Sequence, residues 1–296
     1  KFIKFALGEN VKQSRSNTSY RFPQTRMGVE QVFTDYFQRA KEYDLIKKSG
    51  QPYRKDLEME TLAEILNKER YISCHSYVQS EINMLMHVGD SMGFTVNTFT
   101  HILEGYKVAD KMKKHGAGGS TFSDWWAYKY EVNDAIPYNA AIMHSQGITV
   151  AINSDDAEMG RRLNQEAAKS VKYGKVSELE AWKMVTLNPA KLLQIDDRTG
   201  SLKVGKDADV VVWSANPLSV NAIVEQTIVD GTVYYDKNMD ALLQKKNQAE
   251  KARIISKMLD ANSTSDAKTQ PFFKRKKGHY HCNTLGEELS TEENSL

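Results

Sequence analysis

The sequence predicts an α/β fold: part of a (β/α)8 TIM-type barrel, about units four to eight, followed by strands of a small β-sandwich domain. Short apolar runs alternate with longer segments of helical spacing through residues 1–195, which is the pattern of parallel strands joined by crossover helices. One barrel unit takes about 30 residues. The separation of His75 from His101 fits one unit, and that of His101 from Asp155 fits two.

The expected barrel strands are short apolar runs, at residues 2–7, 71–75, 94–99, 117–122 and 148–152. The segments between and after them carry apolar side chains at helical spacing. This spacing predicts helices at residues 27–49, 56–70, 81–92, 107–114, 135–146, 161–173 and 178–188. The polar segment 8–26 predicts a loop, and Gly116 is expected to end the helix that precedes it.

Residues 196–237 predict the strands of the β-sandwich domain. A strand at 210–213 precedes a hairpin of residues 223–229 and 232–235, with Asp230 and Gly231 in its turn. Residues 238–296 predict a charged helix at 241–259 and then a disordered tail rich in Ser, Thr, Asn and Lys.

The composition limits the class of function. The chain has 296 residues, 40 Lys and Arg against 38 Asp and Glu, and a formal net charge of +2. This balance argues against a nucleic-acid-binding protein, and the basic run at 274–277 is weak evidence for one. No apolar run approaches the roughly 20 residues of a membrane-spanning helix. Cys74 and Cys282 exclude a disulfide framework. Localisation stays open, because any leader would lie before Lys1.

Three residues at or near predicted strand ends are candidates for a metal site. His75 and His101 each follow a short apolar strand, and neutral imidazole is a common ligand of zinc. Asp155 follows the strand at 148–152, where a carboxylate can bind an ion and also accept a proton from water. Taken alone, each histidine is more simply interpreted as an ordinary polar residue at a strand end. Asp155 alone is equally a helix cap, although Asp156 suits that role better.

Lys4 is a fourth candidate, because it lies inside the apolar strand at 2–7. A buried lysine is costly unless it is paired or modified, and a carbamylated lysine that bridges two metal ions is one solution. The alternatives are a Lys4 side chain that points to solvent and a site in which Glu9 serves instead.

Other residues are candidates for substrate binding or for a separate cluster. Arg26 and Arg161 are candidates for binding a substrate carboxylate, and Trp125 for lining a pocket at the barrel mouth. A solvated tail is the simpler interpretation of the remaining cluster, which consists of His279, His281 and Cys282.

Several motifs in order resemble the metal-dependent amidohydrolase superfamily, in particular its imidazolonepropionase-like branch. They are ALGENVK, PQTRMGVEQ, YISCHSY, THILEGYKVAD, ITVAINSDD, VTLNPAKLLQIDDRTGSLKVGKDADVVVW and VDGTVYYD, and they extend over about residues 2–237. The resemblance implies a distorted (β/α)8 barrel with a β-sandwich built from both chain ends. It also implies a site for one or two divalent ions, with zinc the expected metal.

By matching motif, the resemblance assigns His75 to the histidine of strand five and His101 to that of strand six. It assigns Asp155 to the aspartate of strand eight and Lys4, less securely, to the lysine of strand four. The implied activity is hydrolysis of a carbon–nitrogen bond in a small amide or cyclic amide by a metal-activated water, with Asp155 moving the proton. A carbamylated Lys4 would favour two ions and a dipeptidase-like reaction. An unmodified Lys4 would favour one ion and an imidazolonepropionase-like or deaminase-like reaction. A homo-oligomer is expected by the same resemblance.

The sequence departs from the family pattern in one respect. The family places a His-x-His pair on strand one, whereas the His-x-His of this chain is His279/His281 near its end. We therefore expect a fragment that covers the C-terminal portion of an amidohydrolase and is poorly stable alone because open strand edges stay exposed. The alternative function is a catalytically incomplete scaffold, or one half of a split enzyme.

Overall fold

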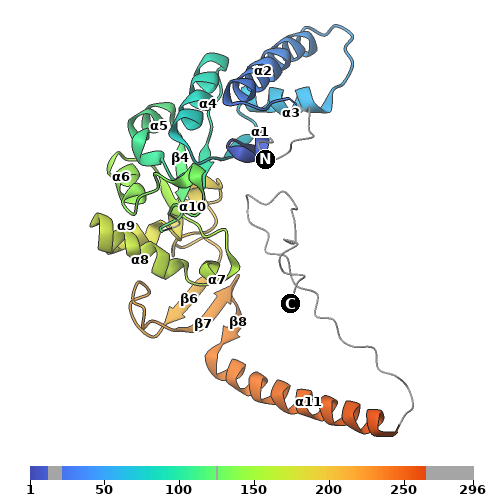
Figure 1. Ribbon diagram of the computed structural model, residues 1–296, viewed down its shortest axis with the longest axis vertical. Coiled ribbons are helices and arrows are strands. Elements are labelled where there is room, and N and C mark those ends of the chain that lie inside the picture. Colours follow the sequence, from blue (N-terminus) through green and yellow to red (C-terminus); the bar gives the residue numbers. More distant parts are fainter. Residues whose placement is uncertain (13–21, 125, 265–296) are drawn as a thin grey trace. The chain divides into compact units, whose positions relative to one another are not determined.

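The computed structural model describes residues 1–12, 22–124 and 126–264 (Figure 1). The chain divides into two compact units. The first unit is Lys1–Ser201, and the second, which begins at Leu202, is described as far as residue 264. The residues His279, His281 and Cys282, the basic run at 274–277 and Trp125 therefore lie outside the described residues.

The first unit is built on a parallel sheet of five strands whose spatial order is their order in the chain. These strands are β1 (Phe2–Ala6), β2 (Tyr71–His75), β3 (Thr98–Thr100), β4 (Gly118–Thr121) and β5 (Val150–Ile152). The expected α/β fold with a parallel sheet is confirmed. Within the described residues β1 and β5 form the two edges, so the sheet is open and does not close into a barrel.

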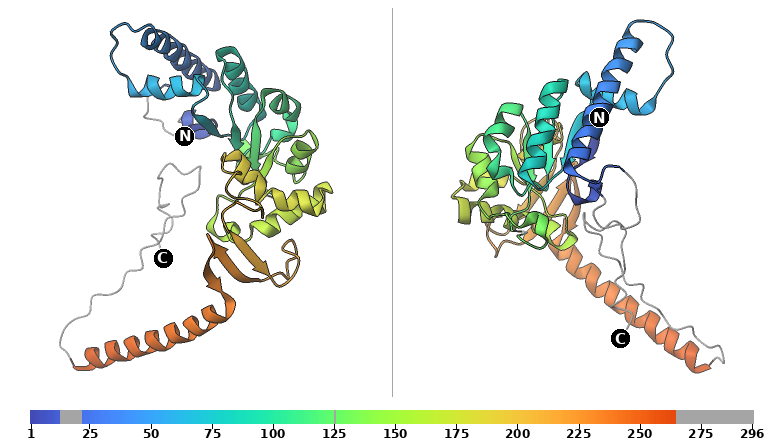
Figure 2. Two further views of the ribbon diagram at one scale, coloured as in Figure 1. Left: turned by 180° about the vertical axis from the view of Figure 1, so that it is seen from behind. Right: turned by 45° about the horizontal axis from the view of Figure 1, so that its top comes forward.

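Helices connect the strands, as parallel pairing requires. The connecting helices are α1 (Glu9–Lys12), α2 (Arg26–Lys48), α3 (Leu57–Leu66), α4 (Gln79–Met92), α5 (Ala109–His115) and α6 (Asn139–Ser145). Four more helices follow β5, namely α7 (Ala157–Gly160), α8 (Leu163–Gly174), α9 (Glu178–Lys183) and α10 (Leu187–Leu192). Helices α2 and α3 lie against each other (blue, Figure 2).

Local sequence signals explain where several helices begin and end. The Thr25 hydroxyl accepts a hydrogen bond from the backbone of Gly28 at 3.1 Å and caps α2. Asp56 caps α3 by accepting from the backbone of Glu58 at 2.9 Å. As expected, α5 ends at Gly116, which adopts φ +88°, a conformation that glycine reaches without strain.

The two faces of the five-stranded sheet differ in chemistry, because side chains alternate along each strand. One face carries apolar residues in register: Phe5 lies opposite Cys74, and Cys74 opposite Phe99. Helix α2 covers this face, because the centroid of the Phe5 ring lies 6.1 Å from that of Phe37 on α2. Phe37 in turn stacks on Phe94 at 4.0 Å. This apolar face is part of the core of the unit.

The opposite face of the sheet is polar. Lys4 lies opposite Ser73, and His75 lies opposite Thr100, which itself lies opposite Ser120. The hydroxyls of Ser73 and Thr100 are 2.9 Å apart and form a hydrogen bond between neighbouring strands. A parallel sheet buried on both faces normally shows near-continuous apolar runs, so a polar face indicates a role other than core packing.

The second unit contains a three-stranded antiparallel sheet and a long helix. Its strands are β6 (Val210–Trp213), β7 (Val224–Val229) and β8 (Thr232–Asp236). The predicted hairpin is present, with Asp230 at φ +50° and Gly231 at φ +77° in its turn. Helix α11 (Lys237–Thr264) follows and is longer than expected.

Other elements also differ from the sequence-based expectation. The strand expected at 94–99 is Thr98–Thr100, and Phe94 and Val96 lie buried in the loop that precedes it. The helix expected at 178–188 is two helices, α9 and α10. Pro189 is tolerated in the first turn of α10 but would interrupt a continuous helix. The loop expected at 8–26 includes the short helix α1.

No helix in the described ranges is both long and apolar enough to cross a bilayer.

Candidate active site

The structure brings His75 and His101 together at the carboxyl ends of neighbouring strands. His75 is the last residue of β2, and His101 directly follows β3. Their ring centroids are 5.1 Å apart, and the residues are 3% and 6% exposed. The carboxyl ends of parallel strands are where α/β proteins place their chemistry. This pair is therefore the centre of the candidate site.

Burial keeps both imidazoles neutral at neutral pH. It lowers the pKa of His75 to about 3, with further lowering by the charges of His101, Lys4 and Lys129. Burial likewise lowers the pKa of His101 to about 4; the charge of Lys4 also lowers it, whereas that of Asp155 raises it. Neutral imidazole is the form that binds a metal ion.

The donor set at this pair fits a metal ion. The Nε2 atom of His75 is buried and has no hydrogen-bond partner among the described residues. Buried polar atoms in folded proteins are nearly always satisfied, and each exception calls for a cause. A metal ion bound at Nε2 would supply that partner, because imidazole nitrogen is a preferred zinc ligand.

Asn153, which follows β5, contacts the second histidine. Its side-chain nitrogen lies 2.9 Å from Nδ1 of His101, and its Oδ1 is buried without a partner among the described residues. If the Asn153 amide is turned by 180°, Nδ1–H of His101 can donate a hydrogen bond to Oδ1 of Asn153. His101 then carries its proton on Nδ1, and its Nε2 is unprotonated and can bind a metal ion. A hydrogen bond of this kind fixes the tautomer of metal-binding histidines. Asn153 is thus suited to orient His101.

The two aspartates after β5 have separate roles. Asp155 is close enough to act on the charge of His101, and its backbone adopts the left-handed conformation, with φ +55°. His101 shares this conformation, with φ +63°. Asp156 caps α7 by accepting hydrogen bonds from the backbones of Glu158 and Met159, both at 2.9 Å, as the sequence predicts.

The described residues include no group of three or more His, Cys, Asp and Glu side chains arranged to hold a metal ion. The two histidines and Asp155 thus lie at the same end of the sheet without closing around one point. His75, His101 and Asp155 stay predicted ligands.

Lys4 lies on the polar face of the sheet, and of the two alternatives for its side chain the structure shows the exposed one. Its side chain is exposed because β1 is an edge strand, so that the cost of burying an amine does not arise. The charge of Lys4 lowers the pKa of both His75 and His101, which places its amine on the side of the histidines. Glu9, the other candidate, begins α1, and its backbone N–H donates to Glu131 at 2.9 Å.

The arginines proposed for substrate binding bind carboxylates of their own. Nε of Arg26 is 3.3 Å from Oε1 of the buried Glu81, and Arg26 also donates to Ser80. Arg161 forms an ion pair with Glu158 on α7, and both side chains are largely exposed. The recorded contacts of Arg26 and Arg161 do not include the histidines.

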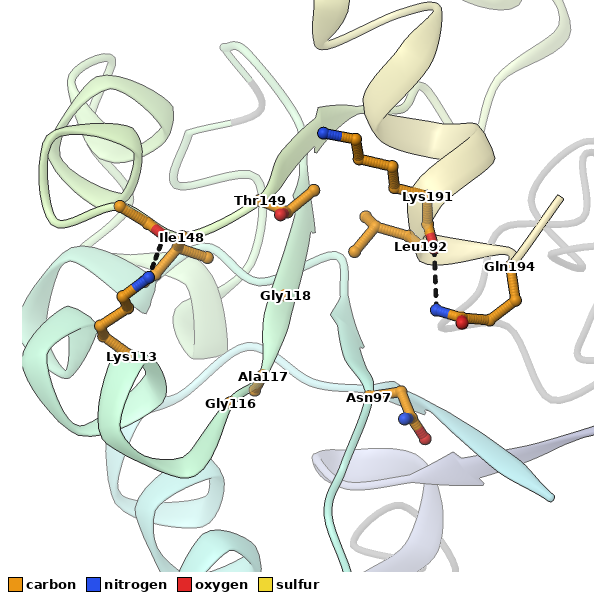
Figure 3. A pocket seen from close by; sticks show the side chains of 11 residues that line it. Asn97, Lys113, Gly116, Ala117, Gly118, Ile148, Thr149, Lys191, Leu192 and Gln194 are labelled. Carbon is orange, nitrogen blue, oxygen red and sulfur yellow. Dashed lines mark hydrogen bonds between the residues drawn. The ribbon is translucent and has the colours of Figure 1, made fainter. Parts of the chain in front are cut away.

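A cavity of about 290 Å³ lies at the other end of the sheet (Figure 3). Lys113 and Lys191 lie at its walls, and the Lys113 amine donates to the carbonyl of Gly147 at 2.8 Å. The lining residues lie at the amino ends of strands β3, β4 and β5, in α5 and at α10, whereas His75 and His101 lie at the carboxyl ends of their strands, so this cavity is separate from the candidate site. Its lining residues are Asn97, Lys113, Gly116, Ala117, Gly118, Gly147, Ile148, Thr149, Lys191, Leu192 and Gln194.

Comparison with known proteins identifies the family. The family model described as "Amidohydrolase family" matches residues 34–234, which is more than half of the chain. The chain belongs to the amidohydrolase family. The resemblance stated from the sequence motifs is therefore confirmed.

Two curated relatives of this amidohydrolase carry enzyme names. Amidohydrolase tasK from Hapsidospora irregularis is 28% identical over 273 residues, which cover 86% of this chain and 28% of that protein. An imidazolonepropionase from Thermoplasma volcanium is 27% identical over 135 residues, or 45% of this chain and 33% of that protein. The chain thus spans about a third or less of the length of these curated relatives.

Solved structures support the fold of this amidohydrolase. The crystal structure of an amidohydrolase from Thermotoga maritima has a TM-score of 0.71 and 29% identity, covering 79% of this chain and 62% of that one. A prolidase crystallised with N-methylphosphonate-L-proline has a TM-score of 0.51 and 17% identity, covering 79% of this chain and 68% of that one. The second likeness concerns the fold alone.

Sequence reasoning missed three residues next to His75. The Tyr77 ring lies edge-on to the His75 ring, with centroids 4.7 Å apart, and the Lys129 amine is 4.2 Å from the centre of the Tyr77 ring. Glu131 forms an ion pair with Lys129 at 2.8 Å. Tyr77 is near His75 in the sequence, but Lys129 and Glu131 come from a distant loop that carries no motif. No sequence signal could have found these two.

Proposed function

We propose that this amidohydrolase hydrolyses a carbon–nitrogen bond in a small amide or cyclic amide, using one or two divalent metal ions, with zinc the expected metal. The observation that carries the proposal is the pair of buried, neutral imidazoles at the strand ends, one of which has a buried nitrogen atom with no partner among the described residues. The enzyme names of the two curated relatives support the reaction class.

The proposal includes the architecture. We infer that the five parallel strands correspond to about units four to eight of a (β/α)8 barrel. The strand order, the crossover helices and the likeness to the Thermotoga maritima amidohydrolase support this correspondence. In such a barrel the polar face of the sheet would point inward, where side chains can contact a substrate.

His75, His101 and Asp155 would hold the ion. A bound zinc lowers the pKa of a coordinated water and polarises a carbonyl group. Asn153 holds the ring of His101 in one orientation. Asp155, whose charge acts on His101, would accept the proton from the attacking water.

The number of ions depends on Lys4. As a carbamate, Lys4 would add a negatively charged oxygen ligand for a second ion; as an amine, it would add a positive charge that repels one. Metal analysis of the full chain and of Lys4→Gln distinguishes these cases. Two ions in the parent and one in the variant would support the bridged site, whereas one ion in both would exclude it.

Zinc binding by the full chain tests the proposal most directly. We expect His75→Ala to weaken Zn²⁺ binding by at least about a hundredfold, because one ligand is lost from a site that offers few others. His87→Ala, an exposed histidine on α4, is the matched control and should bind as the parent does. Hydrolysis is then followed on a panel of dipeptides and cyclic amides. Equal zinc binding by His75→Ala and the parent would refute the proposed site.

A further inference from the structure

The connection between β4 and α6 passes beside the candidate site. We call residues 126–138 the strap. The strap carries Val132, which is fully buried and packs in a cluster with Tyr77, Leu103 and Phe122. Val132 therefore fixes the strap against Tyr77, whose ring contacts the His75 ring.

Glu131 attaches the strap to the end of β1. Its side chain is 4% exposed, and its Oε1 accepts the backbone N–H of Glu9 at 2.9 Å. Its Oε2 accepts from the Lys129 amine at 2.8 Å. Both carboxylate oxygens thus have partners, one on the strap itself and one just after the strand that carries Lys4. A charged group this deeply buried is tolerated only with such partners.

Gly8 leaves the space that this contact needs. It has φ +89°, and a Cβ atom there would lie 2.8 Å from Oε1 of Glu131. Any other residue would be strained and would push the carboxylate away. The backbone after β1 is thus shaped to receive Glu131.

Lys129 connects Glu131 to the histidine through an aromatic ring. Its amine lies 4.2 Å from the centre of the Tyr77 ring, a cation–π distance, and its side chain is 11% exposed. The Tyr77 ring is itself 1% exposed and meets the His75 ring at an interplanar angle of 83°. The contacts Glu131–Lys129–Tyr77–His75 form one continuous chain of buried side chains.

We propose that Glu131 is a positioning residue for the site: it ties the strap to the end of β1 and, through Lys129 and Tyr77, fixes the orientation of the His75 ring. The inference rests on the proposed function, because it concerns a histidine proposed to bind a metal ion. Without the Glu131 carboxylate, the Lys129 charge would be buried without its counter-ion. The Lys129 amine would then move to solvent and leave the Tyr77 ring. Tyr77 would be held less firmly against the His75 ring.

The test compares Glu131→Gln with the parent in the full chain. The amide keeps the volume and can still accept from Glu9, but it removes the charge that holds Lys129. The matched control is Glu60→Gln, because Glu60 also accepts from a lysine and a tyrosine, Lys47 and Tyr43, both at 2.6 Å, between α2 and α3. Hydrogen exchange in the strap, the Zn²⁺ dissociation constant and the absorption spectrum of bound Co²⁺ are measured for each protein.

We expect Glu131→Gln to exchange amide hydrogens in the strap at least tenfold faster and to bind Zn²⁺ about 10–100-fold more weakly, the range typical of outer-sphere partners of metal-binding histidines. The Co²⁺ spectrum should shift, which a loss of stability alone would not cause. Glu60→Gln should leave all three unchanged. If amide hydrogens in the strap exchange at the parent rate in Glu131→Gln, Glu131 does not attach the strap to the end of β1. If they exchange faster but Zn²⁺ binding and the Co²⁺ spectrum are unchanged, Glu131 does not position His75.

A second variant and a metal-free readout keep the two proposals separate. If Glu131→Gln does not fold, Lys129→Met replaces it, since it keeps the stem over Tyr77 and deletes the charge; Lys129→Arg should restore the parent values. If the parent itself binds no Zn²⁺, the proposed function fails. The NMR signals of the His75 ring then test the positioning role without metal. A change of their chemical shifts in Glu131→Gln but not in Glu60→Gln supports the role of Glu131 in orienting the ring, and unchanged shifts refute it.

Discussion

The apolar and polar faces of the five-stranded sheet are made by alternate residues of the same strands, yet they have opposite properties. The apolar face packs Phe5 against Phe37 and contributes to stability. The polar face carries His75, which lies in register with Thr100 and whose Nε2 has no hydrogen-bond partner among the described residues. Stability and chemistry are thus assigned to opposite faces of one sheet. Substitutions on each face can show whether this separation holds.

The largest expected effect is on the pH dependence of the metal-free protein. The pKa values of His75 and His101 are about 3 and 4 in the fold, below the ordinary value near 6.5. Between about pH 6.5 and pH 4 the unfolded chain therefore binds protons that the folded chain does not. The free energy of unfolding should fall as pH falls, by about 1.4 kcal/mol per pH unit for each histidine.

Urea denaturation at several pH values, with His75→Gln beside the parent, measures this effect. The variant should lose the contribution of one histidine and show a shallower slope. Equal slopes in the two proteins would mean that His75 is not the group that responds to pH.

A smaller effect is expected on the apolar face. Phe37→Ala removes a ring that is 1% exposed and stacks on Phe94, so the free energy of unfolding should fall by about 3–5 kcal/mol. The Zn²⁺ dissociation constant of the molecules that remain folded should not change. Chemical denaturation and zinc titration of the same sample provide both values. Weaker zinc binding in the folded fraction would show that the faces are coupled.

The smallest effect is expected from Ser73→Ala on the polar face. This change removes the hydrogen bond to Thr100 and should lower the free energy of unfolding by about 0.5–1.5 kcal/mol. Thermal unfolding, with Ser256→Ala at an exposed position of α11 as a reference, measures the difference. A loss as large as that of Phe37→Ala would contradict the assignment of stability mainly to the apolar face.

Much of the parallel fold could be predicted from the sequence, because its strands are short apolar runs with distinct ends. The run Tyr71–His75 is a strand with the predicted bounds, and the hairpin turn at Asp230 and Gly231 is a local signal. The break between α9 and α10 was missed although Pro189 signals it. The sequence left open whether Lys4 is buried or exposed, because this depends on which strand forms the edge of the sheet.

The candidate site was predicted only in part, for a related reason. His75 and His101 follow strands and could be placed from the order of elements alone. Asn153 follows β5 and could have been found by the same rule. Lys129 and Glu131 could not, because long-range packing of Val132 against Tyr77 brings them to the site. Site residues that come from loops can be found only once the tertiary structure is known.

The left-handed backbone of His101 and Asp155 has a consequence for laboratory evolution. At φ +63° and +55° each residue is in a conformation that costs a non-glycine side chain free energy, on the order of 1 kcal/mol. At His101 glycine would also leave a cavity where the buried ring stacks on Phe122 at 5.0 Å, so the imidazole is retained for packing as well. At Asp155, whose side chain is exposed, no such packing opposes the change, and selection for thermal tolerance alone would favour glycine there. A library screened for heat resistance should therefore include a functional screen, or the carboxylate will be lost while the imidazole remains.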